Sequence, residues 1–190
     1  MARSLTPSLS SSPNCQVGTL SKPNPVDGIE ASWAVSREAM RLATHDIPNT
    51  GMAVTIDTGN PIDLHPKNKK PIGIRHAYHA LANTYGKDIV GDGPQYISHT
   101  IRERRFILSF DSIGSGLMAA REGPINSFAI AGNDQVWHWA NARIKDDTVV
   151  VSSPEVENPV AVRYAWAMNP SQRNLCLLYT SPSPRDRSSS

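Results

Sequence analysis

Asp63 and His65 are the two residues whose types and spacing most readily suggest catalysis. They follow the apolar run 52–56, which is bounded by turn signals and predicts a short, buried parallel strand. Ligands of open α/β sheets bind beyond the carboxyl ends of such strands, so a loop at this point can carry site residues. Histidine titrates near neutral pH and is the commonest general base. His65 is therefore the predicted base, with an adjacent acid to orient it; a loop histidine that only pins the next helix is the alternative.

No convincing nucleophile lies upstream of His65. Asp111-Ser112 and Gly114-Ser115-Gly116 imitate nucleophile motifs, but neither has the G-x-S-x-G spacing or the strand–turn–helix context of a nucleophile elbow. Both also follow His65, in a region of strand-like periodicity. We predict a strand end and a turn at these positions, which leaves the base without an evident serine.

Two further polar groups lie on the helix predicted after this loop. His76 and His79 are three residues apart, a spacing that could place both on one metal ion. No third ligand is obvious, and a half-exposed helix face explains the two histidines equally well. Lys67, Lys69 and Lys70 form a short basic cluster, which we interpret as a solvated helix start rather than a phosphate site. No metal site is predicted.

Trp137, His138 and Trp139 form the main aromatic group. In a strand, successive side chains point to opposite faces, so the two tryptophans share one face and His138 lies on the other. Two exposed tryptophans could stack on sugar rings, whereas the core of a β-sandwich explains them equally well. We predict core positions for both rings; exposed and coplanar rings would favour sugar binding.

Composition limits the class of protein. The chain has 190 residues, enough for one or two domains, with 39% hydrophobic and 19% charged residues. The formal net charge of +2 is too small to argue for nucleic acid or an anionic membrane as a partner. No apolar run approaches the ~20 residues of a membrane span, and the N-terminus lacks the apolar core of a signal peptide. Cys15 and Cys176 give no disulfide framework and leave the compartment open.

The first part of the chain predicts an irregular segment followed by a helix–strand–helix unit. Residues 1–28 are rich in Ser, Pro and Asn and have no periodicity, which is typical of loop or disorder. Residues 29–90 contain a helical stripe over 33–44, the strand 52–56, and a second amphipathic helix that Asn68 can cap. This order places the loop with the predicted base between a buried strand and a helix.

Near Gly91 the period of the apolar pattern changes from helical to two. Short strands recur through residues 91–175, and Asp146-Asp147 predicts a hairpin turn between two of them. Such spacing is typical of an antiparallel β-sandwich. The predicted fold class is therefore an α/β unit followed by an all-β domain.

Residues 176–190 differ from the rest of the chain. The eleven residues from Cys176 to Asp186 match one reading frame of a common transposon-based sequencing adapter. We interpret 176–190 as a read-through scar, with the native chain cut off near Leu175, and expect a gene fragment from an assembled metagenome whose start is equally arbitrary. A natural Ser/Pro-rich disordered tail is the alternative.

Several separate segments together carry a resemblance to a known family. They are Leu64-His65-Pro66-Lys67-Asn68-Lys69, Leu108-Ser109-Phe110-Asp111, Gly114-Ser115-Gly116-Leu117, residues 149–156 and residues 158–167. On these segments the chain resembles the C-terminal part of sialate O-acetylesterase-like proteins, which are SGNH-type serine esterases. The resemblance covers about residues 30–175, with a faint further match at Pro13-Asn14.

The resemblance implies that residues 29–90 are part of an SGNH (flavodoxin-like) domain and that His65 is its catalytic histidine. In such esterases a serine attacks the acetyl carbonyl, the histidine takes the serine proton and later gives it to the leaving sugar hydroxyl, and an acid orients the histidine. The acid generally stands three residues before the histidine, where this chain has Ile62. Asp63 is therefore our choice of acid and Asp57 the reserve.

The resemblance also implies the partner and setting of the whole protein. Its substrate would be an acetylated carbohydrate such as O-acetylated sialic acid, it would need no cofactor, and it would be secreted or periplasmic. The nucleophile and oxyanion-hole blocks have no match here, so we expect the chain alone to be inactive. The rival hypothesis is a non-catalytic carbohydrate-binding or structural β-sandwich module, and the oligomeric state is left open.

Overall fold

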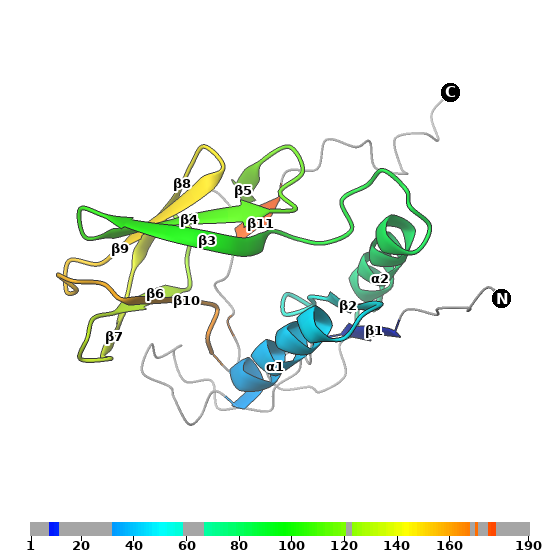
Figure 1. Ribbon diagram of the computed structural model, residues 1–190, viewed down its shortest axis with the longest axis horizontal. Helices are drawn as coiled ribbons and strands as arrows, with labels where there is room; N and C mark the ends of the chain where they lie inside the picture. Colours follow the sequence, from blue (N-terminus) through cyan, green and yellow to red (C-terminus); the bar gives the residue numbers. More distant parts are fainter. Residues whose placement is uncertain are drawn as a thin grey trace.

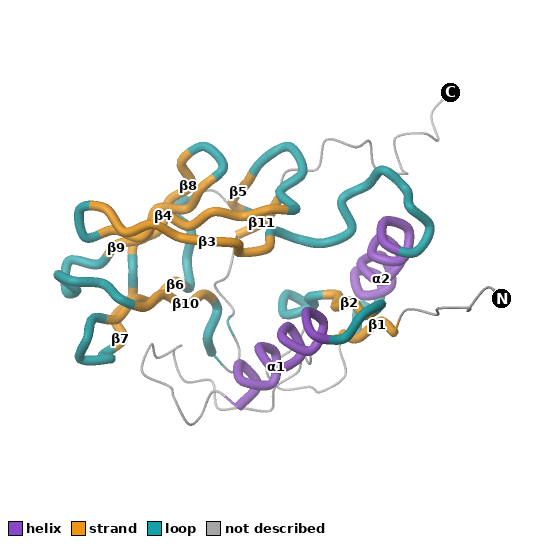
Figure 2. Tube along the Cα trace, viewed as in Figure 1, coloured by secondary structure: helices purple, strands orange, loops and turns teal. Residues whose placement is uncertain are grey.

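The computed structural model describes residues 8–11, 32–58, 67–120, 123–167, 170 and 175–177 (Figures 1 and 2). Two helices, α1 (Ser32–Asp46) and α2 (Lys70–Asn83), lie within these ranges, and neither is long and apolar enough to cross a membrane. The strands found there are β1 (Ser8–Ser11), β2 (Thr50–Ala53), β3 (Gln95–Arg102), β4 (Arg105–Asp111), β5 (Leu117–Ala119), β6 (Phe128–Ala131), β7 (Trp137–Trp139), β8 (Asn141–Lys145), β9 (Thr148–Ser152), β10 (Ala161–Tyr164) and β11 (Leu175–Leu177).

Two parallel strands and both helices form one end of the molecule (Figure 1). β1 pairs in parallel with β2, from Ser8 opposite Thr50 to Ser11 opposite Ala53. Both helices contact β2. The buried positions of β2 are Gly51 and Ala53, whose small size lets the helices approach the strand closely. The α/β character predicted for this part of the chain is confirmed.

β1 corrects the prediction of an irregular segment over residues 1–28. A parallel ladder is made by backbone groups, which Ser8–Ser11 supplies although three of its four residues are serines. The remainder of 1–28 lies outside the described residues. β2 is also displaced from the predicted strand 52–56, because Val54 is already 42% exposed and the chain turns after it.

The two predicted helices are present, and their ends follow local signals. α1 contains the whole of the predicted stripe 33–44. At the start of α2, the N-cap residue is Lys69 and not the predicted Asn68, and no side chain caps the helix. Asn68 instead accepts the Lys70 N–H at Oδ1 (3.2 Å), and Pro71 occupies the first turn. Gly86, just beyond the helix end, has a φ of 59°, a left-handed conformation that favours glycine.

Antiparallel sheets make up the other end of the molecule (Figure 2). The strand orders are β3-β4-β9-β8, β10-β6-β7 and β11-β5. Lys145 pairs with Thr148, so Asp146-Asp147 is the two-residue turn that the sequence predicts, and Asp146 has the positive φ (52°) that such turns require. The predicted antiparallel region is therefore present, and the fold combines a mixed α/β part with antiparallel sheets.

The hydrophobic core lies between the two larger sheets. It contains Phe106 and Leu108 from β4, Val149 and Val151 from β9, and Phe128 and Ile130 from β6, with Ile125, Ala142 and Val156 around them. In β4 buried and less buried positions alternate, as a strand with one buried face requires, whereas β9 is buried at all three of its central positions. β6 is buried at all four positions, so it has no alternating pattern from which to predict it.

β11 extends into the predicted tail. Cys176 lies opposite Met118 and Leu177 opposite Leu117 in an antiparallel pair with β5. Two residues that we assigned to the tail therefore pair with the β region, because a ladder needs only backbone groups. Residues 178–190 lie outside the described part of the chain.

Arg37 of α1 ties the helical part to the β region. Its Nη2 donates to the carbonyl oxygens of Ala165 (3.1 Å) and Ala167 (2.7 Å), just beyond β10. In Figure 1 the chain that follows β10 runs towards the start of α1. The two parts are thus joined by this contact as well as by the segment between α2 and β3.

Candidate functional site

The predicted site residues Asp63 and His65 lie outside the described residues, in the interval between Thr58 and Lys67. The chain is described on both sides of this interval. One side follows β2, and the other leads into α2. The structure therefore shows what holds the two ends of the segment that carries the predicted base.

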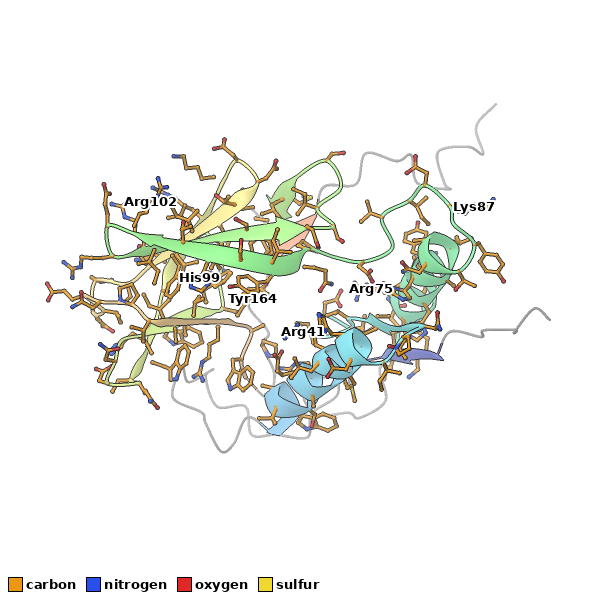
Figure 3. The ribbon with its side chains drawn as sticks, in the orientation of Figure 1. Arg41, Arg75, Lys87, His99, Arg102 and Tyr164 are labelled. Atoms are coloured by element: carbon orange, nitrogen blue, oxygen red, sulfur yellow. The ribbon has the colours of Figure 1, made fainter. Side chains whose placement is uncertain are left out.

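Arg75 of α2 holds the end that follows β2 (Figure 3). Its Nη1 donates to Oδ1 of Asp57 (2.5 Å) and to the carbonyl oxygen of Val54 (2.8 Å), while Nη2 donates to Oδ2 of Asp57 (2.5 Å). Two parallel N–H···O bonds are the bidentate geometry that pairs guanidinium with carboxylate. The side chains of Arg75 and Asp57 are 36% and 46% exposed, so solvent screening limits the net stabilisation to about 1 kcal/mol.

This geometry gives Asp57 a role in holding the backbone. Both of its carboxylate oxygens accept hydrogen bonds from one guanidinium, which lies 18 residues further along the chain. Asp57 precedes His65 and Arg75 follows it. The salt bridge therefore closes a loop that contains the predicted base.

The other end of the segment is a solvated helix start. Lys67, Lys69 and Lys70 are all exposed, as predicted for this cluster. The first turn of α2 contains no acidic residue. Asn68 supplies the local contact, accepting the Lys70 N–H as described above.

A cavity of about 580 Å³ lies near Thr50, at the amino-terminal end of β2, whereas Asp57 follows the carboxyl end of this strand. Mostly polar residues line it, among them Arg41, Thr44, Thr50, His79, Asn83 and Asp92. The segment with the predicted base leaves from the other end of β2. Neither Asp57 nor Lys67, which flank that segment on its two sides, lines the cavity.

His79 joins α2 to β2 at the edge of this cavity. It is 8% exposed, and its Nδ1 lies 2.8 Å from Oδ1 of Asp92 and 3.1 Å from Nδ2 of Asn83. A Cβ atom on Gly51 would lie 1.6 Å from Nε2 of His79, so the ring packs directly on the backbone of β2. The sequence reasoning missed this role, because Asp92 lies 13 residues away with no periodic relation to the histidine.

His76 and His79 were weighed as a possible pair of metal ligands. No group of three or more His, Cys, Asp and Glu side chains there is placed to hold a metal ion. The described contacts of His79 instead join it to Asp92 and Asn83, which suits an anchoring role.

The serines that imitate nucleophile motifs lie between β4 and β5. Ser112, Gly114 and Gly116 have φ values of 52°, 60° and 131°, all in the left-handed region used by turns. A strand follows, so the strand–turn–helix context of a nucleophile elbow is absent at this position. The predicted strand end and turn are confirmed.

The tryptophans of β7 differ from the prediction of two core rings. Trp139 is 43% exposed, and Trp137 is half-buried with the Arg163 guanidinium carbon 4.0 Å from its ring centroid. They lie opposite Ala129 and Ala131 of β6, which are almost fully buried. The two tryptophan side chains cover the two alanines, and Trp139 stays partly open to solvent. The core prediction is therefore wrong for Trp139.

A solved structure matches most of this chain. The crystal structure of XAC1771, a novel carbohydrate acetylesterase from Xanthomonas citri, aligns with it at a TM-score of 0.72 and 42% sequence identity. The chain resembles part of a carbohydrate acetylesterase. The match covers 76% of this chain and 33% of the acetylesterase. No family model and no curated protein matches the chain.

The chain thus spans about a third of the length of the acetylesterase that it matches. A shared fold does not by itself assign chemistry, which has to be argued from the site. Within the described residues, Arg75 holds the exit from β2, and His79 anchors α2 on the same strand.

Proposed function

We propose that this chain is the histidine-bearing part of a serine esterase that removes O-acetyl groups from a carbohydrate. The observation that carries the proposal is the 42% identity to a carbohydrate acetylesterase over 76% of the chain. The motif around His65 adds support, since it stands after a parallel strand and before α2, where an SGNH-type α/β fold would present its base. O-acetylated sialic acid is the substrate that the sequence motifs favour.

In the proposed mechanism His65 acts first as a base and then as an acid. It takes the proton of a serine hydroxyl, supplied by another part of a longer protein, as the serine oxygen attacks the acetyl carbonyl. The tetrahedral intermediate collapses, the sugar oxygen leaves with the proton from His65, and an acetyl-serine remains. Water then attacks this ester while His65 takes a proton from it. His65 gives that proton to the serine oxygen as it leaves, and acetate is released.

Asp63 is the acid that we assign to His65. It would accept a ring N–H and stabilise the imidazolium that forms when His65 is protonated. The reserve, Asp57, already holds Arg75 with both carboxylate oxygens. That engagement favours Asp63, although the spacing differs from the family pattern by one residue.

A graft tests the proposed function. This chain replaces the matching third of the Xanthomonas citri acetylesterase, and hydrolysis of p-nitrophenyl acetate is measured for the graft, for its His65→Ala variant and for this chain alone. We expect turnover by the graft, a loss of about 100-fold or more in kcat on His65→Ala, and no turnover by the chain alone. Graft activity that does not depend on His65 would contradict the assignment.

The second candidate is a carbohydrate-binding module, which the exposure of Trp139 favours. An indole ring that is open to solvent can stack on a sugar ring. A change in tryptophan fluorescence with millimolar N-acetylneuraminic acid, absent in Trp139→Ala, would support this candidate. An unchanged spectrum would count against it.

A further inference from the structure

We propose that the cavity beside β2 binds a neutral saccharide, whose hydroxyl groups donate hydrogen bonds to oxygen atoms of the lining side chains. The cavity has a volume of about 580 Å³ and lies between α1, β2, α2 and the segment that leads into β3. Small-molecule sites occur preferentially at such junctions and usually have volumes of about 300–1,000 Å³. This ligand class follows from the lining groups, all of which the structure describes, and not from the proposed esterase activity.

Burial decreases from the floor of the cavity to its mouth. Gly51 and His79 are buried and form the floor. The half-buried walls are Thr44, Thr50, Met52, Asp92 and Gln95, and the exposed rim is Arg41, Asn49, Asn83 and Thr84. A ligand that enters past the rim therefore reaches polar groups that are partly withdrawn from water.

The floor and one wall are held in place by contacts within the protein. The His79 ring packs on the backbone of Gly51, and its Nδ1 lies 2.8 Å from Oδ1 of Asp92. The residue before Asp92 is Gly91, where a Cβ atom would lie only 2.8 Å from Cβ of Ala82 in α2. The chain therefore passes close against α2 on its way to the cavity wall. A site that is ordered in advance avoids the entropy cost of ordering it on binding.

Two threonine hydroxyls in the wall already donate to the protein backbone. The Thr44 hydroxyl donates to the carbonyl oxygen of Arg41 at 2.8 Å, and the Thr50 hydroxyl donates to that of Ile47 at 2.6 Å. A hydroxyl has a single hydrogen to donate but two lone pairs that can accept. Each of these side chains therefore offers a ligand an acceptor and no donor.

The other polar side chains of the wall have the same bias. Asp92 holds His79 through Oδ1, and a carboxylate has a second oxygen that can accept further hydrogen bonds. Gln95 donates from Nε2 to the carbonyl oxygen of Gly93 at 3.4 Å, and its Oε1 is again an acceptor. A wall rich in acceptors fits a ligand rich in donors, and the hydroxyl groups of a sugar supply several donors on one small ring.

The charges around the cavity favour a neutral ligand. The Arg41 guanidinium donates from Nε and Nη2 to the two oxygens of Glu38 at 2.9 and 2.7 Å, so its charge is already paired. The Asp92 carboxylate faces His79 from the wall. An anionic ligand would approach the carboxylate of Asp92, and a cationic ligand would approach the guanidinium at the rim. A neutral sugar meets neither repulsion.

The test is an NMR titration of this chain with methyl α-D-glucopyranoside, followed by the backbone amide signals. We expect saturable shifts at Gly51, Thr84 and Gln95, with a Kd of about 1–10 mM, and no shift at Val151 in the β core. Sodium glucuronate is the charged comparison and should bind at least about threefold more weakly. The absence of saturable shifts up to about 100 mM sugar would mean that the cavity holds only water, and would overturn the proposal.

Two substitutions of similar shape test the predicted acceptors. Thr44→Val and Gln95→Leu should each weaken sugar binding by about three- to tenfold, the effect of losing one hydrogen bond. Thr100→Val is the matched control, because this threonine is exposed on β3 and does not line the cavity. Equal urea midpoints for Thr44→Val and the parent chain would show that the fold is intact.

Sugar binding that is unchanged in both Thr44→Val and Gln95→Leu would place the ligand elsewhere and refute the assignment. Glucuronate that binds as tightly as the neutral sugar would refute the neutral ligand class. These readouts need no esterase activity, so an inactive graft would overturn the proposed function and leave the result for the cavity unaffected.

Discussion

The His79 ring packs directly on the backbone of Gly51 in β2. The imidazole occupies the space that a side chain on residue 51 would need. Because Asp92 and Asn83 hold the ring from the other side, it has little freedom to move away. Glycine is thus required at this position of β2 for packing, independently of its backbone conformation.

Gly51→Ala should therefore lower the free energy of unfolding by about 1–3 kcal/mol, the usual cost of overpacking. Gly73→Ala is the control, because no atom lies within 4 Å of the Cβ position on this residue of α2. There the substitution should raise stability by up to about 1 kcal/mol, since alanine favours helix. Urea unfolding followed by circular dichroism measures both. Equal effects would mean that His79 moves aside without cost.

Glu38 and Arg41 form an ion pair on the surface of α1. The Arg41 guanidinium holds the pKa of Glu38 below its usual value through hydrogen bonds, and partial burial opposes this effect. A pKa that is lower in the folded chain means that the pair stabilises the fold above the unfolded pKa of Glu38. That stabilisation is lost as the pH falls through the folded pKa.

Arg41→Ala should accordingly lower stability near neutral pH by about 0.3–0.5 kcal/mol, the range for half-exposed pairs on one helix. In acid, where Glu38 is protonated, the parent and the variant should unfold at the same urea concentration. Unfolding curves at a series of pH values test this. A difference that persists in acid would instead point to packing lost with the arginine stem.

Both ends of the described molecule leave some large apolar side chains exposed, but only the β region buries others completely. Several on the α1, β2 and α2 side are about half exposed: Val35, Leu42, Ile47, Val54 and Ile74. In the β region Phe106, Ile130, Val149 and Val151 are completely buried. Two helices and a strand pair cannot cover their own apolar faces, so the helical part draws less stability from burial.

Amide hydrogen exchange should therefore be slower in β4 and β9 than in β2 and α1. The amides of Phe106 and Val151 should be among the best protected, and those of Val54 and Ile56 among the least. The measurement is native-state exchange followed by NMR. Equal protection at Val54 and Val151 would show that the helical part is stabilised by more than its described contacts.

Local sequence patterns determined much of the secondary structure. The stripe over 33–44 and the Asp146-Asp147 turn each depend on residues a few positions apart, and each is found where predicted. The same holds for the turn around Ser112, which excluded a nucleophile elbow there. The cap predicted at Asn68 lies one residue later, at Lys69. The roles of Asp63 and His65 remain predictions, because these residues lie outside the described chain.

Only the tertiary structure decided which distant groups meet. The pairing of β1 with β2, the grip of Arg75 on Asp57, and the contact of His79 with Asp92 and Gly51 join residues that no short-range period relates. The burial of β6 and the exposure of Trp139 likewise depend on which sheet faces pack together. The sequence by itself determined where helices, turns and the His65 motif lie, because those follow from neighbouring residues. The contacts between distant residues follow from surfaces that meet only on folding.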